Sequence, residues 1–244
     1  MHLYYADRKK IWTKILFQFG IAAIQKFMKY FSKLFLSILL ITITAIAGAY
    51  FFWYKPKFNA GGHSFTLAPK TKDEYKSILT KLNNNSSVIK KFAADNKLNT
   101  HFCFMIDMSI PSGRERFFVY NLQKDSVELA GLVTHGQGSP GISGIEFSNT
   151  HGSNCTSLGK YKIGGKYNGK FGLAYKLYGL DKTNNNALER FVVLHAHDCV
   201  PDAEVYPLSV CQSQGCPTVS PKFLQKLANY IDVSDKAMLL NIYK

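Results

Sequence analysis

The chain has 244 residues, 46% hydrophobic and 19% charged, which is the composition of a folded protein with a packed core and excludes a largely disordered, collagen-like or mucin-like chain. Thirty lysines and arginines against sixteen aspartates and glutamates give a net charge of +14, which favours nucleic acid, an acidic polymer or a membrane surface as partner. Five cysteines are too few for a disulfide-rich scaffold.

The first predicted element is a single membrane-spanning helix over residues 34–54. This stretch, LFLSILLITITAIAGAYFFWY, contains no charged side chain, and as a helix it would cross roughly 30 Å of hydrocarbon. The segment before it, 1–33, is rich in lysine and arginine, so the positive-inside rule places this basic segment in the cytoplasm and the rest of the chain outside. A cleaved signal peptide is the alternative, because Ala47-Gly48-Ala49 has the form of a processing site.

Much of the positive charge belongs to this N-terminal part. Residues 55–244 carry 23 basic and 15 acidic side chains, a net charge of +8. A domain outside the cytoplasm meets little nucleic acid, and the sequence has no zinc finger, helix-turn-helix or aromatic RNA-binding motif. We therefore expect no nucleic-acid partner.

A linker and a helical lead-in follow the predicted span. Residues 55–70 contain glycine, proline and basic residues without a hydrophobic period and are interpreted as a linker. Residues 71–98 have apolar side chains at helical spacing on both sides of a polar NNNSS stretch at 83–87. This pattern predicts two short amphipathic helices joined by a turn.

From residue 99 to 244 the pattern is that of a mainly β domain. Apolar residues alternate from Phe102 to Met108, and short β-branched and aromatic segments separated by Gly, Asn, Ser or Pro continue to the end of the chain. One helix interrupts them, with Ser220 as N-cap and Pro221 at its first position. The predicted fold class is therefore mainly β, a β-sandwich with few helices, preceded by a single transmembrane helix.

Cys216 and His195 are the first candidates for chemistry. Cys216 lies in SQGCP, between a β-rich stretch and the predicted helix, where Gly215 allows a tight turn whose N–H groups could face an oxyanion. In the strand-like FVVLHAHDC, a period of two places His195, His197 and Cys199 on one face. A histidine beside the thiol would take its proton and stabilise the thiolate.

Several motifs in order resemble the L,D-transpeptidase catalytic domain (YkuD-like) family, in its variant with a Ser-x-Gly-Cys-Pro nucleophile motif. The resemblance covers residues 104–219, roughly half of the chain. The matching stretches are FMIDMSIPSGRERFFVYNL, HGQGS at 135–139, FSNTHGS at 147–153, SLGKY at 157–161, YNGKFG at 167–172, YGLDKTNNNALER at 178–190, VVLHAH at 192–197 and SQGCP at 213–217. The chain departs from the common family pattern at Gln214, where many members have His, and in an insertion at 200–212.

The resemblance implies roles for individual residues. Cys216 would be the nucleophile and His195 the base, oriented by a backbone carbonyl, while the N–H groups of Gly215 and Cys216 would bind the oxyanion. The candidates for substrate binding are Ser213, which could also hold the loop, His135, Arg190 and Tyr161. For Arg190 an alternative is that it satisfies carbonyls in the core, for Tyr161 that it packs there, and for His135 that it is structural or faces solvent.

By the same resemblance the function is that of a membrane-anchored peptidoglycan L,D-transpeptidase. The thiolate would attack the carbonyl at the L-centre of meso-diaminopimelate in a stem peptide, release D-alanine, and pass the acyl group to an amine or to water. The acceptor stays open between a second diaminopimelate and a lysine of a lipoprotein. No cofactor or metal is implied. The implied location is the inner membrane, held through 34–54, with the catalytic domain in the periplasm.

Two other readings stay open. One is a catalytically inactive peptidoglycan-binding module that keeps the fold. The other is a zinc hydrolase that uses His195 and His197 with Cys199 or Cys216 as a third ligand. The pairing of Cys103, Cys155, Cys199 and Cys211, which could form up to two disulfides, cannot be assigned from the sequence, and a Cys211–Cys216 bridge would block the nucleophile.

Overall fold

The computed structural model describes residues 33, 35–48, 50, 71–141 and 144–244. Residues 35–48 form a helix and residues 71–244 a folded domain, and the two belong to separate units that are described here one at a time. The other residues of the predicted N-terminal segment and linker lie outside the described ranges.

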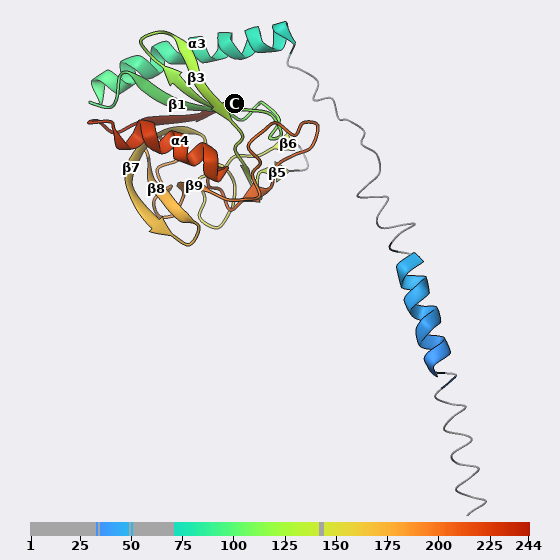
Figure 1. Cartoon of the computed structure of the whole chain (residues 1–244). Helices are drawn as coiled ribbons and strands as arrows, with labels where there is room; N and C mark the ends of the chain where they lie inside the picture. The colour runs from blue at the N-terminus through green and yellow to red at the C-terminus, as the bar shows by residue number, and fades with distance from the viewer. Residues whose placement is uncertain (1–32, 34, 49, 51–70, 142–143) are drawn as a thin grey trace, which may run out of the picture. The chain divides into compact units, whose positions relative to one another are not determined.

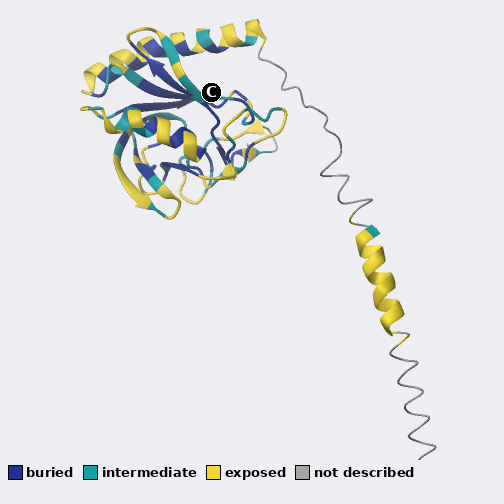
Figure 2. Cartoon of the chain, viewed as in Figure 1, coloured by how far each residue is buried: buried dark blue, intermediate teal, exposed yellow. Residues whose placement is uncertain are grey.

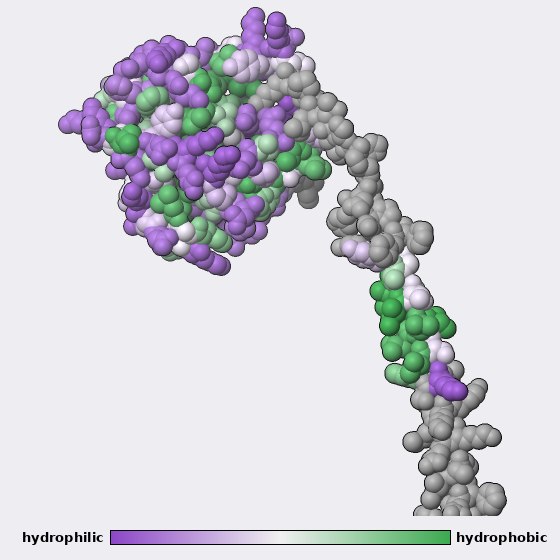
Figure 3. Space-filling model, in the orientation of Figure 1, coloured by the Kyte–Doolittle hydropathy of each residue, from purple (hydrophilic) through white to green (hydrophobic). Residues whose placement is uncertain are grey.

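The 35–48 helix carries mostly apolar, exposed side chains, coloured green in Figure 3. Hydroxyls at Ser37, Thr42 and Thr44 donate to backbone carbonyls three or four residues earlier in the same helix. Within the described residues, no helix has both the length and the apolar character needed to cross a membrane. The predicted span 34–54 extends beyond the described residues at 34, 49 and 51–54.

The domain begins with one long helix, α3 (Lys72–Asp95), which runs through the NNNSS stretch. The prediction of two helices with a turn there is wrong. The polar side chains are accommodated inside the helix, because Asn85 Nδ2 and Ser86 Oγ donate to carbonyls on the preceding turn at 2.9 and 2.8 Å. Asn83 also accepts a 2.6 Å hydrogen bond from the Tyr120 hydroxyl, so this stretch packs on the sheet. Tertiary contacts override the local turn preference of Asn and Ser.

One eight-stranded mixed sheet organises the domain, in the order β11-β9-β8-β7-β12-β1-β2-β3, beside the two-stranded sheets β10-β4 and β5-β6 (Figure 1). The strands are β1 (Phe102–Asp107), β2 (Phe117–Asn121), β3 (Ser126–Gly131), β4 (His135–Gly136), β5 (Pro140–Gly141), β6 (Gly144–Ile145), β7 (Gly159–Gly169), β8 (Gly172–Gly179), β9 (Val193–Ala196), β10 (Gln212–Ser213), β11 (Thr218–Val219) and β12 (Leu239–Tyr243).

The mainly β prediction is confirmed, but eight of the described strands form one large sheet where a sandwich was expected. The C-terminal strand β12 is the reason, because it pairs in parallel with β1 on one side and antiparallel with β7 on the other. It thereby joins into one sheet the two groups of strands that a sandwich would keep apart. Pairing across this long sequence separation leaves no local signal in the sequence.

The two helices cover opposite faces of the sheet. Alternate residues of the central strands point to different cores, as their period of two requires. Phe104 and Leu240 pack with α4 (Pro221–Asp232), whereas Met105 and Leu239 pack with α3. Both faces of the central strands are buried, as the dark blue ribbon in Figure 2 shows. The core on the α4 side includes Leu194 and Ala196 of β9 and Val219 of β11, and so holds the sheet edge that carries the candidate site.

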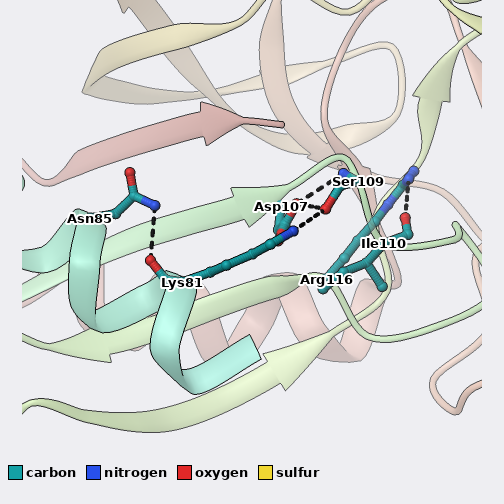
Figure 4. A network of polar contacts seen from close by, with 6 residues as sticks. All are labelled: Lys81, Asn85, Asp107, Ser109, Ile110 and Arg116. Carbon is teal, nitrogen blue, oxygen red and sulfur yellow. Dashed lines mark hydrogen bonds and ion pairs between the residues drawn. The ribbon is translucent and has the colours of Figure 1, made fainter. Parts of the chain in front are cut away.

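A polar network ties α3 to the end of β1 (Figure 4). Lys81 Nζ lies 3.6 Å from a carboxylate oxygen of buried Asp107 and donates to the Ser109 hydroxyl at 2.9 Å. Ser109 donates its N–H and its hydroxyl to the same carboxylate. Nearby, the buried Arg116 guanidinium donates to the Ile110 carbonyl at 3.0 Å. The Asp107 carboxylate, the Ser109 hydroxyl and the Arg116 guanidinium all bind other groups of the protein, which indicates that the network has a structural role.

Candidate active site

The candidate base lies on β9, and the candidate nucleophile lies just before the neighbouring strand β11, at one edge of the large sheet. β9 and β11 pair in parallel with Thr218 opposite His195, and Cys216 lies two residues before Thr218. Cys216 itself lies in the bend before β11, and its side chain and that of His195 reach the same cavity. Both line a cavity of about 390 Å³ together with Ser213 and Gln214.

His195 is held at both ring nitrogens. Nδ1 lies 3.0 Å from the Ala196 carbonyl, which can only accept a hydrogen bond, so Nδ1 carries the proton. Nε2 is then the acceptor and lies 2.9 Å from the Thr218 hydroxyl. The ring is buried and stacks on Phe171, with centroids 5.2 Å apart and planes 19° apart. This arrangement fixes the tautomer in which Nε2 is the basic nitrogen.

The Cys216 thiol is partly buried and bonded at the start of β9. The Val193 N–H donates to Sγ at 3.5 Å, and the thiol lies 3.6 Å from the Phe191 carbonyl as a donor. Phe191 has a left-handed backbone (φ 56°), a conformation that costs a non-glycine residue about 1–2 kcal/mol. Such outliers concentrate at functional sites.

Burial sets the charge state of both groups. It lowers the pKa of His195, although the Ala196 carbonyl acts in the opposite direction. It raises the pKa of Cys216, against the Val193 N–H and the positive charge of Arg190, which both lower it. Both directions favour a neutral thiol beside a neutral imidazole at rest. The thiolate–imidazolium pair suggested by the residue types is therefore not the favoured resting state.

Ser213 and Gly215 shape the loop that carries the thiol. The Ser213 hydroxyl donates to the Cys216 carbonyl at 2.6 Å and accepts the Gly215 N–H at 3.2 Å. Gly215 has φ +105°, and a Cβ there would lie 2.9 Å from the Cys155 carbonyl oxygen. Ser213 thus holds the loop, and it also lines the cavity. The Gly215 N–H, a predicted oxyanion donor, is engaged by Ser213.

Arg190 lies behind this loop and not in the lining of the cavity. Its guanidinium donates to the Ser148 and Cys155 carbonyls at 2.9 and 2.7 Å and to the Ser157 hydroxyl at 3.1 Å. Of its two predicted roles, this arrangement favours the satisfaction of core carbonyls. Its charge still acts on the nucleophile, since it lowers the pKa of Cys216.

The other two predicted substrate-binding residues lie apart from the cavity that holds Cys216. Tyr161 is fully buried, and its hydroxyl is bonded to Ser157, so the structure gives no support to a substrate contact. His135 is buried and lines a neighbouring cavity of about 270 Å³ with Arg116. Burial, aided by the Arg116 charge, lowers the pKa of His135 to about 4. His135 still positions the site indirectly, because its strand pairs with β10 next to Ser213.

Comparison with known proteins identifies the fold family. The model of the L,D-transpeptidase catalytic domain matches residues 73–242, which is well over half of the chain. The chain belongs to this family. The matched region begins inside α3, so the lead-in helix is part of the L,D-transpeptidase domain.

Solved structures with a related fold are distant. They include Pgp2, the helical cell shape determining protein of Campylobacter jejuni (14% identity, TM-score 0.39, 58% of this chain and 46% of that chain). Bd1075 of Bdellovibrio bacteriovorus is similar at 16% identity, TM-score 0.36, 60% of this chain and 49% of that one. L,D-transpeptidase 1 of Mycobacterium tuberculosis is similar at 12% identity, TM-score 0.29, 59% and 62%. The chain spans about half the length of the first two. No curated protein is significantly similar in sequence.

In this L,D-transpeptidase domain the cysteines are now assigned. Cys199 and Cys211 form a disulfide, whereas Cys103, Cys155 and Cys216 are free. The bridge excludes Cys199 as a thiolate ligand. Among the described residues no three His, Cys, Asp or Glu side chains lie close enough to hold a metal ion. This geometry does not favour the zinc hydrolase.

Two residues of the site were missed by the sequence analysis. Thr218 bonds Nε2 of His195, and its position two residues after Cys216 was the available signal. Phe171 stacks on the imidazole from the turn between β7 and β8, in the YNGKFG motif. No short-range pattern links residue 171 to residue 195, so only the sheet pairing reveals this contact.

Proposed function

We propose that this chain is a cysteine-dependent L,D-transpeptidase that transfers acyl groups from peptidoglycan stem peptides. The observation that supports this most is that Cys216 and His195 line one cavity, with Nδ1 of His195 bound to the Ala196 carbonyl. A base whose tautomer is fixed in this way needs no acidic third residue. Membership of the family, which acts on peptidoglycan, supports the substrate class.

The reaction starts from the neutral pair. The donor carbonyl, at the L-centre of meso-diaminopimelate, enters the cavity beside Cys216. Nε2 of His195 then gives up its hydrogen bond to the Thr218 hydroxyl and takes the proton of the thiol. Sulfur then forms a bond to the carbonyl carbon, and the oxygen that becomes negative is stabilised by the Cys216 N–H. The Gly215 N–H becomes a second donor to this oxygen when its hydrogen bond to the Ser213 hydroxyl breaks.

Collapse of this intermediate gives the acyl-enzyme. The C–N bond to D-alanine breaks, and the proton on His195 passes to the leaving amine. An acceptor amine then attacks the thioester, gives its proton to His195, and the sulfur leaves and is reprotonated. Thiol deprotonation coupled to attack agrees with a raised pKa of Cys216, because no free thiolate has to accumulate.

Membrane attachment is a separate part of the proposal. The uncharged stretch 34–54 and the basic residues before it support a single-pass inner-membrane protein whose N-terminus is cytoplasmic and whose catalytic domain is periplasmic. This location brings the domain to the wall and to lipoproteins, one of which could supply the acceptor lysine. Protease protection in sealed spheroplasts tests it: the domain should be cleaved from outside and segment 1–33 protected.

Intact-mass spectrometry after incubation with a carbapenem tests the chemistry. A carbapenem acylates activated thiols and resembles the stem-peptide donor, so the full chain in mild detergent should gain a single adduct. Cys216→Ala should gain none, and Cys155→Ala, which removes another free cysteine, should still react. A folded wild-type protein with a free Cys216 and no adduct would instead point to an inactive wall-binding module.

A further inference from the structure

The Cys199–Cys211 disulfide is not needed by the mechanism above, yet it lies in the site. Both cysteines line the same cavity of about 390 Å³ as Cys216 and His195. The bridge joins Cys199, directly before the insertion at 200–212 that separates the base from the nucleophile, to Cys211 near the end of that insertion, 12 residues later. The bridge therefore lies among the residues that surround the two candidate reacting groups.

One end of the bridge is next to the group that orients the base. β9 ends at Ala196, whose carbonyl holds Nδ1 of His195. The chain then turns through His197, whose N–H donates to the Val219 carbonyl at 3.0 Å and whose Nδ1 accepts the Cys199 N–H at 3.1 Å. Cys199 therefore follows the orienting carbonyl by three residues, in a segment that is also held by the hydrogen bond from the Val200 N–H to the His197 carbonyl at 3.1 Å.

The other end is next to the group that holds the nucleophile. Cys211 directly precedes β10, where Ser213 bonds both the Cys216 carbonyl and the Gly215 N–H. β10 pairs with β4 over only two residues. A strand this short is weakly held, so a covalent attachment at its start restricts where Ser213 can lie.

The insertion between the two ends has no helix or strand of its own. The whole connection from β9 to β10, residues 197–211, forms turns and irregular backbone, although parts of it bind the rest of the domain. The N–H groups of Val205 and Tyr206 donate to the Gly113 carbonyl at 2.8 and 3.0 Å. These contacts hold the middle of the insertion, whereas the disulfide joins its two ends to each other. Connections of this length without secondary structure are uncommon and are often functional.

We propose that the Cys199–Cys211 disulfide is a positioning element that sets the separation of His195 and Cys216. It links the segment that fixes the base tautomer to the segment that fixes the nucleophile loop. The proposal rests on the proposed function, because the geometry matters only if Cys216 and His195 react together. It makes transpeptidation dependent on an oxidising compartment, where such a bridge persists.

The test compares the oxidised full chain with its Cys199→Ser/Cys211→Ser variant and with wild type reduced by a phosphine. The second-order rate constant of carbapenem acylation at Cys216 should fall at least about 10-fold in the variant, because a misplacement of about 1 Å can cost about 100-fold. Reductant should slow wild type to the same level and leave the double variant unchanged.

Two further measurements separate positioning from stability. The acylation rates are measured well below the melting temperature of the variant. If the double variant does not fold, the comparison uses gently reduced wild type, and circular dichroism checks that its domain stays folded. The pH profile of Cys216 alkylation by iodoacetamide, followed by peptide mapping, should shift when the bridge is absent, since the imidazole then no longer sits at its fixed distance.

The outcomes are distinguishable. Equal acylation rates and an unchanged alkylation profile without the bridge would overturn the positioning role and leave the proposed function intact. No acylation of oxidised wild type at Cys216 would overturn the proposed function, whereas a shift of the alkylation profile on removal of the bridge would still support the positioning role.

Discussion

Gly215→Ala probes the loop that presents the nucleophile. At φ +105° an L-residue is strained, at a cost of about 1–3 kcal/mol. The new Cβ would also lie 2.9 Å from the Cys155 carbonyl oxygen and 3.3 Å from the Arg190 guanidinium. Because the first neighbour is backbone, the loop has to move. We expect the free energy of unfolding to fall by about 3 kcal/mol in total, which for a domain of this size lowers the melting temperature by about 6–12 °C.

Activity should fall by more than stability does. A shift of the loop moves Cys216 and its N–H together, so carbapenem acylation should slow about 100-fold at a temperature where the variant is folded. Urea unfolding and intact-mass kinetics measure the two effects. Gly152→Ala is the matched control: it also has a positive φ (+76°) but no atom within 4 Å of the new Cβ, so it should lose about 1 kcal/mol and keep its acylation rate. A Gly215→Ala protein as stable and reactive as wild type would refute this account of the loop.

Three further predictions follow from burial. Because burial raises the pKa of Cys216, its rate of alkylation by iodoacetamide should keep rising above pH 9; a plateau below pH 8 would contradict this direction. The pKa of His135 falls from 6.5 to about 4 on folding, so the unfolded chain takes up this proton at higher pH. His135 should therefore remove roughly 3 kcal/mol of stability as the pH drops from 6.5 to 4, and urea unfolding of His135→Gln should lose that part of the pH dependence. Tyr161→Phe removes a buried hydroxyl bonded to Ser157 and should cost about 1 kcal/mol without slowing acylation; a specific loss of acylation would restore Tyr161 as a substrate-binding residue.

The sequence predicts the parts of this protein that depend on local pattern. The alternation around β1 and the cap of α4 by Ser220 are examples, since the Ser220 hydroxyl accepts the Phe223 N–H as the motif requires. The assignment of Cys216 and His195 as a pair depended on a longer constellation of motifs. The structure places His195 on β9 and Cys216 just before the neighbouring strand β11, in one cavity. Their roles stay predictions until the thiol is shown to react.

What the sequence could not supply is set by contacts between distant segments. The continuity of α3 depends on Tyr120 and the sheet beneath the NNNSS stretch, and the single large sheet depends on β12 lying between β1 and β7. The disulfide partner of Cys199 was open because cysteine spacing alone allows several pairings. The burial of Tyr161 likewise follows from its place in the middle of the sheet.

Release of D-alanine from a stem tetrapeptide that carries meso-diaminopimelate tests the central claim most directly. The full chain in detergent is incubated with the purified disaccharide-tetrapeptide, and the free amino acid and the muropeptide products are measured by mass spectrometry. We predict D-alanine release with a new cross-linked or trimmed product for wild type and neither for Cys216→Ala. D-alanine release at the same rate by the Cys216→Ala protein would contradict a cysteine acyl-enzyme.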